Sequence, residues 1–132
     1  MSTNTLLDSF YAAIKAADAP ALAQCVQPDF KLHWQGTPSI PWAGDWRGVD
    51  GLLAFFKLLD QHILVLDVQR LHTLSNDQVT VVVLKGRWKT RASGVELSAM
   101  AANVFEFADG KIRSYTVLNN TAAFAEALAA AS

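Results

Sequence analysis

Residues 97–107 alternate between apolar and other side chains, which fits a β-strand with one buried face. Side chains of a strand point to its two sides in turn, so every second residue shares a face. On one face of this strand, a single amide interrupts an apolar row that consists of Leu97, Ala99, Ala101, Asn103, Phe105 and Phe107. A buried amide needs a hydrogen-bond partner or costs roughly 1–3 kcal/mol. The partner is a neighbouring group, a trapped water or a ligand, and the pattern therefore predicts a lined cavity.

The composition is that of a globular domain with a large apolar interior. Hydrophobic residues make up 52% of the 132 residues and charged residues 17%, which excludes a disordered chain and predicts one domain over residues 1–132. The chain has 11 basic and 12 acidic residues and a formal net charge of −1. This balance argues against a nucleic-acid partner, because phosphate binding needs a basic surface.

Several absences in the sequence suggest a cytoplasmic protein. No apolar run approaches the roughly 20 residues that cross a bilayer, so we expect no membrane partner. The first residues lack the pattern of a secretory signal, and the single cysteine, Cys25, cannot form an internal disulfide. Cys25 fits a packing residue of a helix better than a nucleophile. No histidine pair has ligand spacing with a carboxylate, and we expect neither a metal nor another cofactor.

The first half of the chain predicts three helices and one strand. Apolar residues recur at helical spacing in three segments, and Asp18 and Pro20 stand where a helix cap and first turn are expected. The predicted elements are a helix over 5–17, a short helix after Asp18, a strand over 30–35 and a helix over 49–62.

Residues 36–48 show neither a helical nor a strand pattern. Loops of this length in compact domains are usually functional or disordered. Trp42 and Trp46 argue for order, because so much apolar area favours burial. We expect this loop to close one end of a pocket, with Trp34 of the preceding strand as a wall.

The second half predicts a four-stranded meander and a last helix. Asp109 and Gly110 form a hairpin signal between the last two strands, and Asn120 is the predicted cap of the helix. The predicted strands cover residues 63–74, 79–91, 95–107 and 112–119. The order of elements indicates an α+β domain in which helices cover a curved sheet.

Four groups of residues, in this order of elements, carry a resemblance to a known family. They are residues 10–14 with Ala17-Asp18, Asp29-Phe30, residues 48–52 before Phe55-Phe56, and residues 104–112. Over nearly its whole length the chain resembles the nuclear transport factor 2-like superfamily, in particular its SnoaL-like and ketosteroid isomerase-like branches. The resemblance implies a cone-shaped half-barrel: a curved, mainly antiparallel sheet packed against three helices of the N-terminal half, with a short C-terminal helix. It also implies a deep apolar cavity and a homodimer formed through the sheet.

The acid–base residues of ketosteroid isomerases are replaced in this chain. The resemblance places their first-helix tyrosine at Phe10, their base at Trp34 and their second aspartate at Asn103. Phe10 has no hydroxyl and Trp34 cannot take up a proton. A carboxylate of the related epoxide hydrolases falls on Val117, and the aspartate of many SnoaL-like chains falls at Asn120. The resemblance thus implies the fold without the familiar chemistry.

The remaining polar and aromatic side chains are the candidate site. We predict ligand contacts from Asn103, Asn119, Tyr115, Trp34, Trp42, Trp46, Phe10, Tyr11 and Trp88. Catalytic residues stay unassigned, with Asp67 and His33 as the candidates for a base. Alternatives stay open: Tyr115 and Trp88 as packing residues, Asn103 as an amide satisfied by backbone or buried water, and His33 as a solvated strand residue.

These residues favour the binding of an apolar small molecule, with or without an isomerase-, cyclase- or hydrolase-like reaction. Asn103 and Asn119 would orient a carbonyl or hydroxyl of the ligand. The loss of the usual acids supports an alternative, a non-catalytic ligand-binding or dimerisation module. A third alternative, a protein-interaction adaptor, predicts an exposed apolar patch instead of an enclosed cavity.

Overall fold

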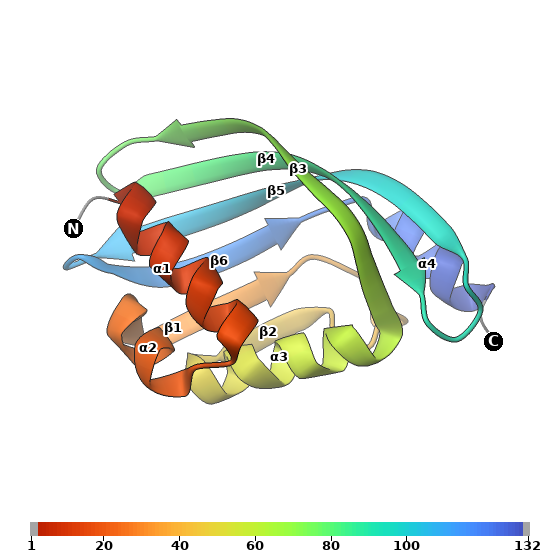
Figure 1. Cartoon of the computed structure of the whole chain (residues 1–132), viewed down its shortest axis with the longest axis horizontal. Helices are drawn as coiled ribbons and strands as arrows, with labels where there is room; N and C mark the ends of the chain where they lie inside the picture. The colour runs from red at the N-terminus through yellow and green to blue at the C-terminus, as the bar shows by residue number, and fades with distance from the viewer. Residues whose placement is uncertain (1–2, 131–132) are drawn as a thin grey trace.

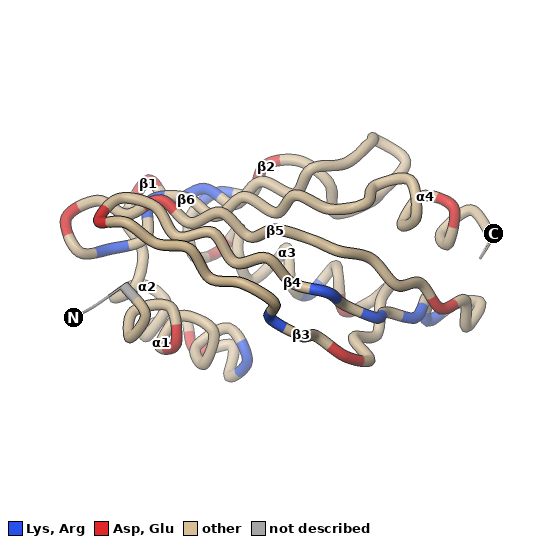
Figure 2. Tube along the Cα trace, turned by 90° about the horizontal axis from the view of Figure 1, so that it is seen from above, with Lys and Arg blue, Asp and Glu red and all other residues tan. Residues whose placement is uncertain are grey.

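The computed structural model describes residues 3–130 and has one curved sheet with helices on its inner side (Figure 1). The six strands follow the order β2-β1-β6-β5-β4-β3, and neighbouring strands are antiparallel except for β1 and β6. The elements are α1 (Thr3–Ala16), α2 (Ala19–Cys25), β1 (Val26–Trp34), β2 (Gly44–Arg47), α3 (Gly48–His62), β3 (Ile63–Ser75), β4 (Val79–Thr90), β5 (Glu96–Ala108), β6 (Lys111–Leu118) and α4 (Thr121–Ala129). This is the α+β half-barrel that the resemblance implies. Figure 2 shows the bend of the sheet from above, with α1 and α2 beneath it.

Short polar side chains fix the ends of the helices as the sequence predicts. The Asp18 carboxylate accepts a hydrogen bond of 3.1 Å from the Ala21 amide at the start of α2. The Asn120 side chain accepts one of 3.1 Å from the Ala123 amide at the start of α4. Both bonds satisfy amides that a helix leaves unpaired in its first turn. Between α1 and α2 the chain turns at Ala17, which has the left-handed φ of 52°.

The first two strands differ from the prediction. β1 begins at Val26 instead of residue 30, and its pairing with β6 is irregular between Val26 and Lys31. The predicted loop 36–48 contains β2, whose Asp45 and Trp46 pair antiparallel with β1. The strand has only four residues and lies at the edge of the sheet, too short for an alternating pattern to distinguish it from a loop.

The predicted hairpin between β5 and β6 is confirmed. Asp109 and Gly110 both have positive φ, 53° and 75°, and Ala108 pairs with Lys111 across them. A two-residue turn with positive φ at both positions matches the right-handed twist of the strands. The turn sets Phe107 opposite Ile112, and an extra residue in β6, Arg113, then shifts the register by one so that Asn103 of β5 lies opposite Val117 of β6.

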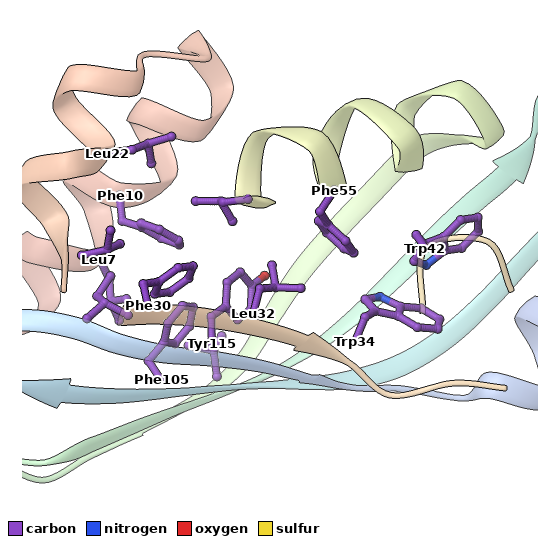
Figure 3. Close-up of a cluster of buried hydrophobic side chains, with 14 of the residues drawn as sticks. Leu7, Phe10, Leu22, Phe30, Leu32, Trp34, Trp42, Phe55, Phe105 and Tyr115 are labelled. Atoms are coloured by element: carbon purple, nitrogen blue, oxygen red, sulfur yellow. The ribbon is translucent and has the colours of Figure 1, made fainter. Parts of the chain in front are cut away.

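Two aromatic clusters fill the space between sheet and helices (Figure 3). In the first, Phe10 of α1 is fully buried against Phe30, Phe105 and Tyr115, with ring centroids 5.9–6.2 Å apart. The Phe105 and Tyr115 rings stack at 4.5 Å. The second cluster packs the rings of Trp34, Trp42 and Phe124 edge to face, with centroids 5.3–6.2 Å apart. Such pairs contribute about 0.5–1.5 kcal/mol each beyond the area that they bury.

Among the helices of residues 3–130, none combines the length and the hydropathy that a membrane span requires.

Candidate functional site

A cavity of about 660 Å³ lies between the inner face of the sheet and helices α1, α3 and α4. Its size falls in the range of about 300–1,000 Å³ that small-molecule sites occupy. Most of its wall is apolar or aromatic, and a few polar groups interrupt it. The lining residues are Tyr11, Lys15, Trp34, Phe55, Phe56, Leu59, Val68, Arg70, Val82, Leu84, Trp88, Ala101, Asn103, Tyr115, Val117, Asn119 and Phe124.

Asn103 lies on the inner face of β5, as the alternation of residues 97–107 predicts. Its side chain lines the cavity and the residue is only 7% exposed. Its Nδ2 donates a long hydrogen bond of 3.4 Å to the hydroxyl of Tyr11. Its Oδ1 accepts no hydrogen bond from any residue within 3–130. The amide is therefore only partly satisfied by the protein itself.

Tyr115 of β6 also lines the cavity, and its ring is held between Phe10 and Phe105. Burial raises the pKa of its hydroxyl far above the ordinary value, and the nearby phenol of Tyr11 raises it further. Burial also raises the pKa of Tyr11, although the hydrogen bond from Asn103 and the charge of Arg70 oppose the shift. Both phenols stay protonated near neutral pH and are hydrogen-bond donors to whatever occupies the cavity.

Asn119 has a structural partner as well as a place in the lining. Its Nδ2 donates a hydrogen bond of 3.0 Å to the carbonyl oxygen of Gln35, which ties the end of β6 to the end of β1. Its Oδ1 is buried and finds no partner in the described part of the chain. One end of this amide thus holds the fold at the wall of the cavity.

Trp34 and Trp88 form aromatic walls of the cavity, and both contact Phe124 of α4. The Trp88 indole lies back over Gly86 of the same strand. A Cβ atom at Gly86 would stand 2.3 Å from the nearest ring carbon of Trp88. The φ of Gly86 is not positive, so the glycine is needed for space and not for an unusual backbone conformation.

Three aromatic residues predicted to contact a ligand lie outside this lining. Phe10 is in the core, and the ring of Tyr115 packs against it. Trp42 is fully buried behind Trp34, with ring centroids 5.5 Å apart, because turns at residues 37–43 fold it toward the core. Trp46 packs against Phe55 and donates a hydrogen bond of 2.9 Å to the Trp42 carbonyl. The loop closes this end of the sheet through packing, and Trp34 alone of the tryptophans near it reaches the cavity.

The two candidate bases also lie outside the lining. His33 is on the outer face of β1, where its Nδ1 is 2.7 Å from an Asp45 carboxylate oxygen. Asp67 is exposed on β3 and pairs with Arg87, whose neighbours Gly86 and Trp88 face inward. An extra residue in β3, Leu66, shifts the register between Val65 and Asp67 and turns Asp67 outward.

The same irregularity places two residues in the lining that the sequence analysis missed. After the shift, Val68 and Arg70 face inward opposite Gly86 and Leu84. Arg70 and His72 are two residues apart on β3, so plain alternation would place both on one face. A second shift, between Arg70 and His72, separates their faces. The residue types of a strand do not indicate where a bulge occurs, so the positions of Val68 and Arg70 could not be predicted. By contrast, the sequence does identify Phe55 and Phe56 as apolar residues of the third helix.

The lining offers hydrogen-bond donors and apolar walls. In the part of the chain that the structure describes, no carboxylate, imidazole or thiol borders the cavity. No group of three or more His, Cys, Asp or Glu side chains within residues 3–130 could hold a metal ion. The chemistry available at this site is therefore hydrogen bonding to a ligand oxygen by neutral phenols and amides, beside the cationic side chains of Lys15 and Arg70.

The family assignment follows from sequence and fold together. The chain belongs to the SnoaL-like domain family, whose sequence model matches residues 7–115. A nuclear transport factor 2-like protein of Burkholderia xenovorans LB400 superimposes with a TM-score of 0.82 at 19% identity, over 96% of this chain and 98% of that one.

Two further solved structures share the fold. A protein of Rhodopseudomonas palustris, named provisionally as an isomerase, has a TM-score of 0.80 at 13% identity, over 98% of this chain and 99% of that one. A protein of Pseudomonas putida KT2440, named provisionally as a polyketide cyclase, has a TM-score of 0.70 at 19% identity, over 96% and 98%. A comparison with curated proteins gave no match. At such identities the likeness defines the fold alone.

Proposed function

We propose that this protein binds a small, largely apolar molecule in the cavity and orients it through hydrogen bonds. The observation that carries the proposal is the state of two polar groups on the cavity wall. Within residues 3–130, neither the Tyr115 hydroxyl nor the Asn103 Oδ1 has a hydrogen-bond partner, and neither atom is fully buried, so both are open to the space of the cavity. A ligand that supplies an oxygen or a donor pairs with these groups, and each such hydrogen bond contributes about 0.5–1.5 kcal/mol.

We favour binding over acid–base catalysis by the protein. The phenols and amides of the lining polarise a carbonyl oxygen but do not take up a proton near neutral pH. The isomerase and cyclase names belong to the structural neighbours. A reaction in this cavity would depend on a proton acceptor brought by the ligand itself.

Fluorescence titration with N-phenyl-1-naphthylamine, a neutral aromatic probe that brightens in apolar surroundings, tests the proposal. We expect saturable binding with one site per chain. Ala101→Trp places a large ring in the cavity and should abolish the signal, because Ala101 lies in the lining. Ala23→Trp, on the exposed surface of α2, is the matched control and should bind as the wild type does. Equal binding by all three proteins would refute the proposal.

The homodimer through the sheet remains a prediction, as does the cytoplasmic location. Met100 of β5 and Leu118 of β6 are 56% and 44% exposed on the outer face of adjacent strands. A second copy that covers these side chains would remove their apolar area from water. Light scattering coupled to size exclusion should give the mass of two chains, and a monomer mass at high concentration would contradict this prediction.

A further inference from the structure

The charged side chains that border the cavity are basic. In the described part of the chain, the lining contains Lys15 of α1 and Arg70 of β3 and no acidic residue. Lys15 follows Tyr11 by about one helical turn, so the two side chains project from the same side of α1. The guanidinium carbon of Arg70 lies 4.9 Å from the centroid of the Tyr11 ring. These three residues, which we call the basic border, connect α1 with β3 at one side of the cavity.

Within the described residues 3–130, the cations of the basic border lack an acidic partner. The ion pairs found within residues 3–130 join His33 to Asp45 and Arg91 to Asp60, so neither Lys15 nor Arg70 is in a salt bridge there. Both are exposed, and Figure 2 shows basic segments at the end of α1 and along β3 and β4. Two unpaired cations beside an apolar wall create a positive potential that attracts anions.

Donors for an anionic group continue from the border into the cavity. The Arg70 guanidinium covers the Tyr11 ring, and the Tyr11 hydroxyl accepts the hydrogen bond from Asn103. The phenolic proton of Tyr11 and the forked N–H groups of Arg70 remain free to bind an oxyanion. In the same lining, Phe55 and Phe56 offer an apolar surface for the rest of a ligand.

On the basis of the proposed function, we infer that the ligand is an apolar molecule with one anionic group, held by Arg70 and Lys15 at the basic border. The class includes carboxylates, sulfonates and acidic enols, which share a charged oxygen and an apolar body. A planar guanidinium binds such groups with two parallel hydrogen bonds, and the ammonium of Lys15 adds a second charge.

Two probes with the same skeleton separate this inference from the proposed function. N-phenyl-1-naphthylamine is neutral, and 8-anilinonaphthalene-1-sulfonate carries an added sulfonate. We expect the wild type to bind the anionic probe more tightly, and more weakly as salt is added, because exposed charges are screened. Arg70→Gln should weaken binding of the anionic probe about tenfold, the effect of one charge-assisted contact, and weaken binding of the neutral probe much less. Arg70→Lys, which keeps the charge, should retain part of the preference.

Arg87→Gln is the matched control, since Arg87 carries the same charge on the outer face of β4. Arg87→Gln should leave the affinity for both probes unchanged. Lys15→Gln should lower the preference for the anionic probe over the neutral one. Equal affinity for both probes in the wild type, or an equal loss of both in Arg70→Gln, would overturn the inference while the proposed function stands. If neither probe binds, or if Ala101→Trp still binds both, the proposed function fails and the inference fails with it.

Discussion

The substitution Gly86→Ala tests how the cavity wall is built, because the sequence and the structure give this glycine different roles. In the sequence, Gly86 stands between Lys85 and Arg87 of a strand, and a glycine in such a place is typical of a kink that lets the sheet bend. In the structure, its missing side chain makes room for the Trp88 indole, and a Cβ would lie 2.3, 2.4 and 2.9 Å from three ring carbons. The nearest of these distances is short of ordinary van der Waals contact by about 1 Å.

The two roles differ in the free energies that they predict. If Gly86 makes room for the ring, alanine forces the Trp88 indole away from the strand and costs about 1–3 kcal/mol of unfolding free energy. Alanine also gains about 0.5–1 kcal/mol over glycine in a strand, so the net cost should be about 1–2 kcal/mol. In a Trp88→Ala background the clash disappears, and Gly86→Ala should instead stabilise by about 0.5–1 kcal/mol.

Urea unfolding of the four proteins in this double-mutant cycle measures the difference. We expect a coupling free energy of about 2 kcal/mol and a reversal in the sign of the Gly86→Ala effect. The same single variant should bind N-phenyl-1-naphthylamine more weakly, since the displaced indole would enter the cavity. If Gly86→Ala lowers the free energy of unfolding equally with and without the Trp88 ring, the reasoning is refuted and the role of Gly86 as a kink is favoured.

Three further predictions concern single sites. Asn103→Leu removes the long hydrogen bond to Tyr11 and an unpaired oxygen, so the free energy of unfolding should change by less than about 1 kcal/mol. The affinity for an apolar alcohol such as 1-naphthol should fall several-fold. A large drop in melting temperature would instead show that the amide is structural. Ala17→Gly relieves a left-handed φ of 52° and should stabilise by about 0.5–1 kcal/mol in thermal melts, and destabilisation would contradict this. The hydrogen bond to Asp45 raises the pKa of His33 above its ordinary value of 6.5. The pair should therefore stabilise the folded protein fully below pH 6.5 and progressively less as pH rises through the raised pKa. An NMR titration in which Asp45→Asn leaves the His33 pKa unchanged would refute this prediction.

Local signals in the sequence predicted most of the fold. Asp18 and Asn120 cap their helices because a short polar side chain pairs with amides inside a few residues, and the partners are fixed by spacing alone. Asp109 and Gly110 specify their turn in the same local way. The inward position of Asn103 followed from alternation along one strand without interruption.

The parts of the site that escaped prediction depend on contacts between distant segments. An extra residue at Leu66 reverses the faces of β3, which moves Asp67 out and Arg70 in. The residue types on either side of a bulge do not record it, because the partner strand decides which residue is left unpaired. Trp42 shows the same limit: its large apolar area predicted burial, but whether it faced the core or the cavity depended on the packing of Trp34 and Phe124.

The indole N–H signals of the tryptophans test the binding claim most directly, because Trp34 and Trp88 line the cavity and Trp46 does not. A nitrogen–proton correlation spectrum should be recorded as N-phenyl-1-naphthylamine is added. We expect the Trp88 indole signal to shift progressively and to saturate, while the Trp46 signal, whose N–H is bonded to the Trp42 carbonyl, stays in place. If saturating probe shifts the Trp46 signal and leaves Trp88 unmoved, the molecule binds elsewhere and the cavity is not the site.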